Sequence, residues 1–305
     1  NTTGTANVAL GHRALLTNTT ASNNTAVGYD ALKLNTIGFN NTAVGSLCLD
    51  AMVSGDYNVA MGTLALTTDA SGNKTTAIGY GALYNQNPAS GADVFNTAVG
   101  YAAGTAVTTG VQNTFVGAEA GDATTTGGYN TAVGKDALGA NTTGGHNVAV
   151  GRLALKSNTT ANNNVSVGNE TLNANTTGTQ NVAVGHAALL ANTTASNNTA
   201  VGYYALLANT TTNNNTAVGT NVLRASTGSN NTGLGTNAGL SVTTGSNNVL
   251  IGYTTGNYGV NITTGSGNII VGNYSTTTAV DSEYANGMGY NLDCEAAYTT
   301  IGNGT

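Results

Sequence analysis

The side chains that could do chemistry in this chain are few, and only one group of them lies close together in the sequence. Four of the 13 acidic residues fall near the end, at Asp281, Glu283, Asp293 and Glu295. Clustered carboxylate oxygens are the ligands that a hard cation such as Ca²⁺ prefers. We interpret this segment as a polar cap or subunit junction, with a calcium site as the alternative.

Catalytic side chains do not form a recognisable set. The three histidines, His12, His146 and His186, are scattered. Two of them directly follow a recurring glycine, in a sequence column that also holds Tyr, Lys and Arg, which indicates a solvated face. No Ser-His-Asp set and no metal-ligand spacing stands out. We therefore expect no enzyme and no cofactor.

Asn-x-Ser/Thr sequons recur along the chain and are potential glycan acceptors in a secreted protein. Many of them follow from the high Asn and Thr content alone. The candidates that we place at an exposed turn are Asn18, Asn141, Asn158, Asn175, Asn192 and Asn209.

The two cysteines, Cys48 and Cys294, are far apart in the sequence. In an elongated array they cannot pair within one chain unless its ends meet. We expect two buried or inert thiols, and an interchain bridge is the alternative.

All these residues are positioned by a unit of 17 residues that a glycine marks, as from Gly11 to Gly28. A short, persistent period is the signature of a solenoid. We predict an all-β fold, a parallel β-roll (β-solenoid) of about 17 coils. It covers residues 1–272, and residues 273–305 form degenerate terminal coils or a capping or junction segment. The marker glycines are Gly11, Gly28, Gly45, Gly62, Gly79, Gly100, Gly117, Gly134, Gly151, Gly168, Gly185, Gly202, Gly219, Gly235, Gly252, Gly272, Gly289 and Gly302.

Each unit reads approximately Asn-Thr-Ala-Val-Gly-x-x-Ala-Leu. The first five residues predict a strand whose side chains alternate between two faces. We expect Thr25 and Val27 inside the coil and Ala26 outside, with a leucine column closing the core from the opposite wall. The outward alanines would then form a smooth stripe for association between chains: Ala26, Ala43, Ala60, Ala77, Ala98, Ala132, Ala149, Ala183, Ala200 and Ala217.

Glycine and asparagine define the corners of the coil. Glycine takes positive φ freely and admits a close neighbouring coil. The asparagine four residues before it, as at Asn24, is expected to form a ladder with its equivalents along the stack. The asparagine seven residues after it, as at Asn35, is expected at a turn with left-handed backbone.

Four coils have glycine in place of the leucine, at Gly104, Gly121, Gly239 and Gly256. In two of these coils an apolar residue follows three positions later, and we expect Val107 and Val242 to compensate for the missing leucine.

Composition narrows the possible partners. The net charge of −6, with only seven basic residues, argues against nucleic-acid binding. No apolar run is long enough to span a membrane.

Units such as Asn41-Thr42-Ala43-Val44-Gly45 and Asn181-Val182-Ala183-Val184-Gly185 resemble the head repeats of YadA-like trimeric autotransporter adhesins. They resemble equally the repeat regions of phage and bacterial tail-fibre proteins. The resemblance implies a left-handed roll, a homotrimer or filament, an extracellular, cell-surface or virion-surface location, and a host or surface glycan or protein receptor. The unit is longer than that of the adhesin heads, and no neck, coiled-coil stalk or membrane anchor is visible.

Three functions stay open. The first is a structural surface fibre or adhesin segment, or a virion tail-fibre receptor-binding shaft, with recognition near Pro88 and Tyr258. The second is an ice-binding solenoid, although neighbouring threonines such as Thr142 and Thr143 point to opposite faces. The third is a β-helical polysaccharide enzyme, which would need a wider coil and a charged groove.

Overall fold

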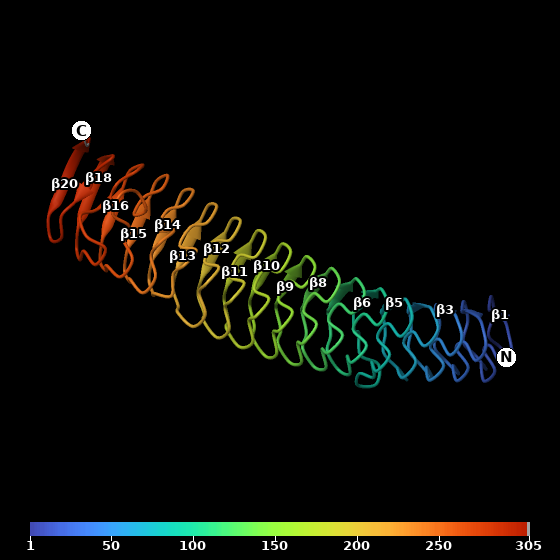
Figure 1. Cartoon of the computed structure of the whole chain (residues 1–305). Helices are drawn as coiled ribbons and strands as arrows, with labels where there is room; N and C mark the ends of the chain where they lie inside the picture. Colours follow the sequence, from blue (N-terminus) through green and yellow to red (C-terminus); the bar gives the residue numbers. More distant parts are fainter. Residues whose placement is uncertain (304–305) are drawn as a thin grey trace. The chain divides into compact units, whose positions relative to one another are not determined.

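The computed structural model describes residues 1–303, which form two compact units. One unit contains Asn1–Leu153 and Ser157–Thr160, and the other contains Ala154–Lys156 and the residues from Ala161 onward. Each unit is a stack of coils, and each coil contributes a short strand to a parallel sheet (Figure 1). No helix occurs within residues 1–303. The predicted all-β parallel solenoid with 17-residue spacing, about 17 turns in all, is confirmed.

The strands are mostly three residues long. The first unit contains β1 (Val8–Leu10), β2 (Thr25–Val27), β3 (Thr42–Val44), β4 (Val59–Met61), β5 (Thr76–Ile78), β6 (Thr97–Val99), β7 (Thr114–Val116), β8 (Thr131–Val133) and β9 (Val148–Val150). The second contains β10 (Val165–Val167), β11 (Val182–Val184), β12 (Thr199–Val201), β13 (Thr216–Val218), β14 (Thr232–Leu234), β15 (Val249–Ile251), β16 (Ile269–Val271), β17 (Thr276–Thr277), β18 (Asn286–Tyr290), β19 (Asp293–Cys294) and β20 (Thr299–Asn303).

Equivalent residues of successive coils lie side by side. In the pairing of β2 with β3, for example, Ala26 lies opposite Ala43. The stacking does not stop at residue 272, because β16 pairs in parallel with β18, and β18 with β20. A second, two-stranded sheet joins β17 to β19. The last segment therefore contains further coils with altered turns.

A marker glycine directly follows each of the strands β1 to β16 at a corner of the coil, as predicted. These glycines have φ between 115° and 155°, a region that L side chains avoid. A Cβ added to Gly28 would lie 2.3 Å from the carbonyl oxygen of Gly45. Glycine is thus required here both by its backbone conformation and by the close approach of the next coil.

The inner and outer faces of the strands are the reverse of the prediction. Ala26 is fully buried, and so are all ten alanines that we expected on the surface, whereas Thr25 and Val27 are half-exposed. A 17-residue coil encloses little volume, and Leu32 reaches across it from the opposite wall. A methyl group fills the remaining space, and two β-branched columns would not fit. The alanines cannot contact another folded chain.

The leucine column closes the core, as predicted, and does so in an unusual conformation. Leu32 and Leu49 are fully buried at φ of 51° and 52°. Left-handed backbone costs an L residue about 1–2 kcal/mol, and burying a leucine contributes about 1.5–3 kcal/mol. Burial therefore offsets the backbone strain at each leucine.

The coils that lack the leucine are completed by a large residue at the centre of a strand. Phe115 occupies an alanine position in β7, and its ring lies where side chains at Gly104 and Gly121 would be. Leu250 in β15 does the same for Gly239 and Gly256. Val107 and Val242, which we expected to compensate, are buried as well.

Both asparagine columns lie inside the coil. In the first, Asn24 Oδ1 accepts the backbone N–H of Asn41 at 2.9 Å, and Asn24 Nδ2 donates to the oxygen of Gly38 at 2.8 Å. In the second, Asn158 Nδ2 donates to Asn141 Oδ1 at 2.9 Å. The predicted ladder is present, but in the first column it runs mainly through the backbone N–H.

The left-handed conformation predicted for the second asparagine column is wrong. None of the asparagines in the second column has a positive φ. The residues with positive φ instead include the leucine column and the residue just before each first-column asparagine, such as Asn23 before Asn24. The second-column asparagines satisfy buried carbonyl groups, and the αL corners fall elsewhere in the coil.

Candidate functional surfaces

The acidic segment does not form a metal site in the described part of the chain. Asp281, Glu283, Asp293 and Glu295 are exposed. Within residues 1–303, no three His, Cys, Asp or Glu side chains are close enough to hold an ion together.

The six sequon asparagines are not exposed, so that prediction is wrong. All are buried, at most 2% exposed. Their amide nitrogens donate inward: Asn192 Nδ2, for example, donates to Asn175 Oδ1 at 2.8 Å and to the oxygen of Ala195 at 3.1 Å. A glycan cannot reach such a nitrogen while the coil is folded. Amides that look like turn residues in the sequence are core residues because they satisfy one another along the stack.

The histidines lie on the surface and take part in a feature that the sequence analysis missed. His12 stacks on Tyr29, with ring centroids 5.3 Å apart, and His146 stacks on Tyr129 at 4.7 Å. These pairs come from neighbouring coils, where equivalent positions lie side by side. Comparing aromatic residues 17 positions apart would have revealed them.

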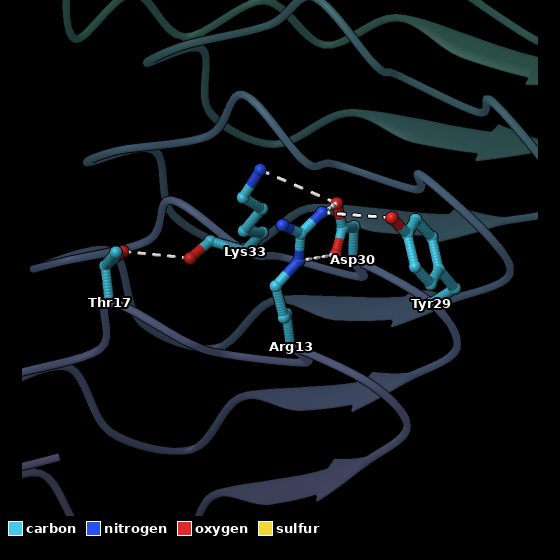
Figure 2. A network of polar contacts seen from close by, with 5 residues as sticks. All are labelled: Arg13, Thr17, Tyr29, Asp30 and Lys33. Carbon is cyan, nitrogen blue, oxygen red and sulfur yellow. Dashed lines mark hydrogen bonds and ion pairs between the residues drawn. The ribbon is translucent and has the colours of Figure 1, made fainter.

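A charged network links two coils of the first unit (Figure 2). Arg13 binds the carboxylate of Asp30 through two nitrogens, with Nε 2.6 Å from Oδ1, and also donates to the Tyr29 hydroxyl at 3.1 Å. Lys33 Nζ lies 3.5 Å from Asp30 Oδ2. The hydrogen bond from Arg13 lowers the pKa of Asp30. This carboxylate is covered by its partners, so the network joins coils and offers no free base.

A second polar network is buried beside the insertion that contains Pro88. Asp69 takes a position in the second asparagine column, and its oxygens accept hydrogen bonds from Gly72 N and Gln86 Nε2, both at 2.7 Å. Gln86 in turn accepts from Asn96 at 2.8 Å. Burial raises the pKa of Asp69. A fully buried carboxylate without a cation is costly when charged.

Both cysteines are buried free thiols. Cys48 replaces an inward alanine, and its Sγ lies 3.1 Å from the oxygen of Ala60. Burial raises the pKa of Cys48 to about 12. Such a thiol carries almost no thiolate at neutral pH and is a poor nucleophile.

The outward residues of the strands form a regular surface that we name the outer strand face, defined as the first and third residues of each of the strands β1 to β16. In β11, β12 and β13 these are Val182 and Val184, Thr199 and Val201, and Thr216 and Val218, paired in register and half-exposed. No charged residue occurs among them. In each unit the face is therefore a neutral array of Thr and aliphatic residues, mostly Val, with the spacing of the coils.

Four tyrosines gather in the second unit where the 17-residue period is interrupted. Tyr274 lies 5.4 Å from Tyr253, 4.9 Å from Tyr258 and 5.8 Å from Tyr290, measured between ring centroids. All three contacts are edge-to-face. We name these four residues the tyrosine cluster.

Neither a protein-family model nor a curated protein sequence matches this chain. Residues 1–303 contain no surface pocket and no helix suited to crossing a bilayer. The outer strand face and the tyrosine cluster are the two exposed features that could serve as binding surfaces.

Proposed function

We propose that this chain is a segment of a structural surface fibre or adhesin, in which copies associate through the outer strand face. The observation that supports this is the neutral surface of Thr, Val and other aliphatic residues that the strands of each unit present. Exposed apolar surface of this extent is typical of interaction sites. Any second copy has the same coil spacing, so its columns match in register along the contact.

The stoichiometry and handedness follow the resemblance to adhesin heads, which favours three left-handed rolls side by side. The alanines are excluded as the contact because they are buried. The Val and Thr columns replace them in the proposal, and the other exposed surfaces stay available for display.

Sedimentation equilibrium of the full chain tests the assembly. We expect a stable trimer. The double variant Val184→Lys/Val201→Lys should dissociate it, because lysines in the contact would be desolvated without partners. The double control Thr194→Lys/Thr211→Lys adds the same charge at exposed turn positions of two neighbouring coils. A wild-type monomer, or equal behaviour of both variants, would refute association through this face.

The same surface favours ice binding as a second candidate. The outward threonines Thr199 and Thr216 are in register two residues before outward valines, which gives a regular hydroxyl and methyl array that the adjacent pair Thr142 and Thr143 could not provide. Thermal hysteresis that disappears in Val184→Lys/Val201→Lys would support it. A chain whose outer strand face is covered by other copies should show none.

A further inference from the structure

We propose that the tyrosine cluster is a binding platform for a neutral oligosaccharide. This deepens the proposed function, because it gives the displayed fibre a ligand class. The platform lies within the coils of one chain, so it does not need the association between copies.

The cluster joins four rings through edge-to-face contacts, whereas elsewhere only Phe39 and Tyr57, a single pair at 77°, show this geometry in the part of the chain that the structure describes. Tyr80 and Tyr101 stack nearly parallel, at 11°, so each covers a face of the other. Within the cluster the interplanar angles are 76°, 63° and 82°. In an edge-to-face pair, the ring that presents its edge keeps its own faces open. Open ring faces are what the C–H face of a sugar packs against.

The cluster also exists because the repeat changes here. Gly252 and Gly272 are 20 residues apart instead of 17, and Tyr258 comes from the inserted turn. Tyr253, Tyr258 and Tyr290 are 45%, 49% and 54% exposed. An aromatic side chain added at an insertion and left half in water is not needed to fill the core.

Two amides beside the rings supply hydrogen-bond donors. Asn273 Oδ1 accepts the N–H of Tyr253 at 2.8 Å, and Asn257 Oδ1 accepts from the Ser241 hydroxyl. Their Nδ2 groups have no hydrogen-bond partner in the part of the chain that the structure describes. Together with the tyrosine hydroxyls, they can pair with the hydroxyl groups of a ligand.

The absence of charge selects the ligand class. No Lys, Arg or His follows Arg224 in the sequence, and no Asp or Glu occurs in the stretch up to Asp281 that holds three of the four tyrosines. The acidic residues nearest to Tyr290 on either side in the sequence, Glu283 and Asp293, would also disfavour an anionic ligand. Anionic ligands such as phosphates or acidic sugars call for cationic partners, which this stretch does not provide. Ring faces, amides and hydroxyls without charge fit a neutral saccharide.

The test titrates the full chain with cellohexaose, laminarihexaose, maltohexaose and chitohexaose. Because the chain has no tryptophan, its fluorescence comes from its 14 tyrosines, four of which form the cluster. Fluorescence therefore detects binding, and calorimetry gives the affinity independently. We expect saturable binding of at least one of these sugars. Tyr258→Ala and Tyr274→Ala should weaken it at least about tenfold, which corresponds to one 1.4 kcal/mol step. Tyr258→Phe should keep most of the affinity, because the ring face is retained.

Tyr101→Ala is the matched control, since it removes an exposed tyrosine from a stacked pair. Unchanged thermal midpoints exclude loss of folding in each variant. The proposal is overturned if none of the four sugars binds, or if Tyr101→Ala weakens binding as much as Tyr258→Ala. Sugar binding by the dissociated Val184→Lys/Val201→Lys variant would separate the two proposals, since a failed trimer and a failed sugar site then give different results.

Discussion

The ring of Phe115 fills the space next to Gly121: a Cβ added to that glycine would lie 2.5 Å from Cε1 of the ring. The same ring also covers Gly104, so one aromatic side chain completes two successive coils. In an ordinary coil, such as that of Ala26 and Leu32, an alanine in the strand faces a leucine on the opposite wall. Phe115 with its two glycines is therefore an inverted form of the same core.

This inversion predicts a strong coupling between the sites. Gly121→Leu alone should overpack the core and destabilise the protein by about 1–3 kcal/mol. Phe115→Ala alone should leave a cavity and cost about 3–5 kcal/mol. The triple variant Phe115→Ala/Gly104→Leu/Gly121→Leu restores the common pattern and should recover most of the loss. Urea denaturation measures the free energy of unfolding of each variant. Additive losses in the triple variant would contradict the proposed coupling between Phe115 and the two glycines.

The corner glycines should be far less tolerant than other glycines with positive φ. Gly28→Ala places a methyl group against the backbone of the next coil, and we expect a loss of about 3 kcal/mol, the upper end of ordinary substitutions. Gly81 has φ of 60° and nothing within 4 Å of an added Cβ. Gly81→Ala should therefore cost only the left-handed backbone penalty, about 1 kcal/mol. Similar losses at both positions would show that close approach is unimportant.

The coil that contains Leu32 shows which parts of the fold the sequence predicts. The period, the glycine corner and the buried leucines all follow from spacing. The inward side of Thr25, Ala26 and Val27 does not, because hydrophobicity favours Val inside and volume favours Ala. The deciding quantity is the width of the coil, which depends on the opposite wall.

The asparagines illustrate a second limit. A single amide such as Asn158 is polar and typical of turns, and it becomes a core residue only when its neighbour 17 positions away offers an acceptor. The sequence does contain the signal for Phe115: the alanine position of the strand holds a large residue where the leucine position of the same coil and of the preceding coil holds glycine. The tyrosine cluster needed the structure, since the inserted turn fixes where Tyr258 lies.

The buried Asp69 should make stability depend on pH. Burial raises its pKa in the folded protein, so the folded state favours the protonated form. Its contribution to stability is fully present below the ordinary aspartate pKa and is lost as the pH rises through the raised value. Asp69→Asn should therefore be more stable than the wild type at pH 7, and this advantage should vanish in acid.

Urea denaturation of both proteins across this pH range measures the difference directly. Asp281→Asn, at an exposed position, serves as the control for removing one negative charge. An advantage of Asp69→Asn that stays constant with pH would indicate packing rather than ionisation as its cause.

The thiol of Cys48 should be unreactive in the folded protein. With its pKa raised to about 12 and its sulfur buried, it should resist Ellman's reagent at pH 8 for hours. Cys294 is buried too, so the native chain should release almost no colour, and both thiols should react at once in 6 M urea. A thiol-sensitive oligomer on a non-reducing gel would instead support an interchain bridge.

The hydrogen bonds of Asn24 to Asn7 and Asn41 have a consequence for how such a gene can change. Each coil presents to the next the same set of donors and acceptors that it receives from the previous one. Duplicating or deleting the codons of one ordinary coil therefore leaves no unpaired donors or acceptors between coils. The protein can become longer or shorter within a unit without further substitutions. Phe115 and Leu250 mark the exceptions, because a coil inserted between either residue and its preceding glycine would separate a side chain from the space it fills.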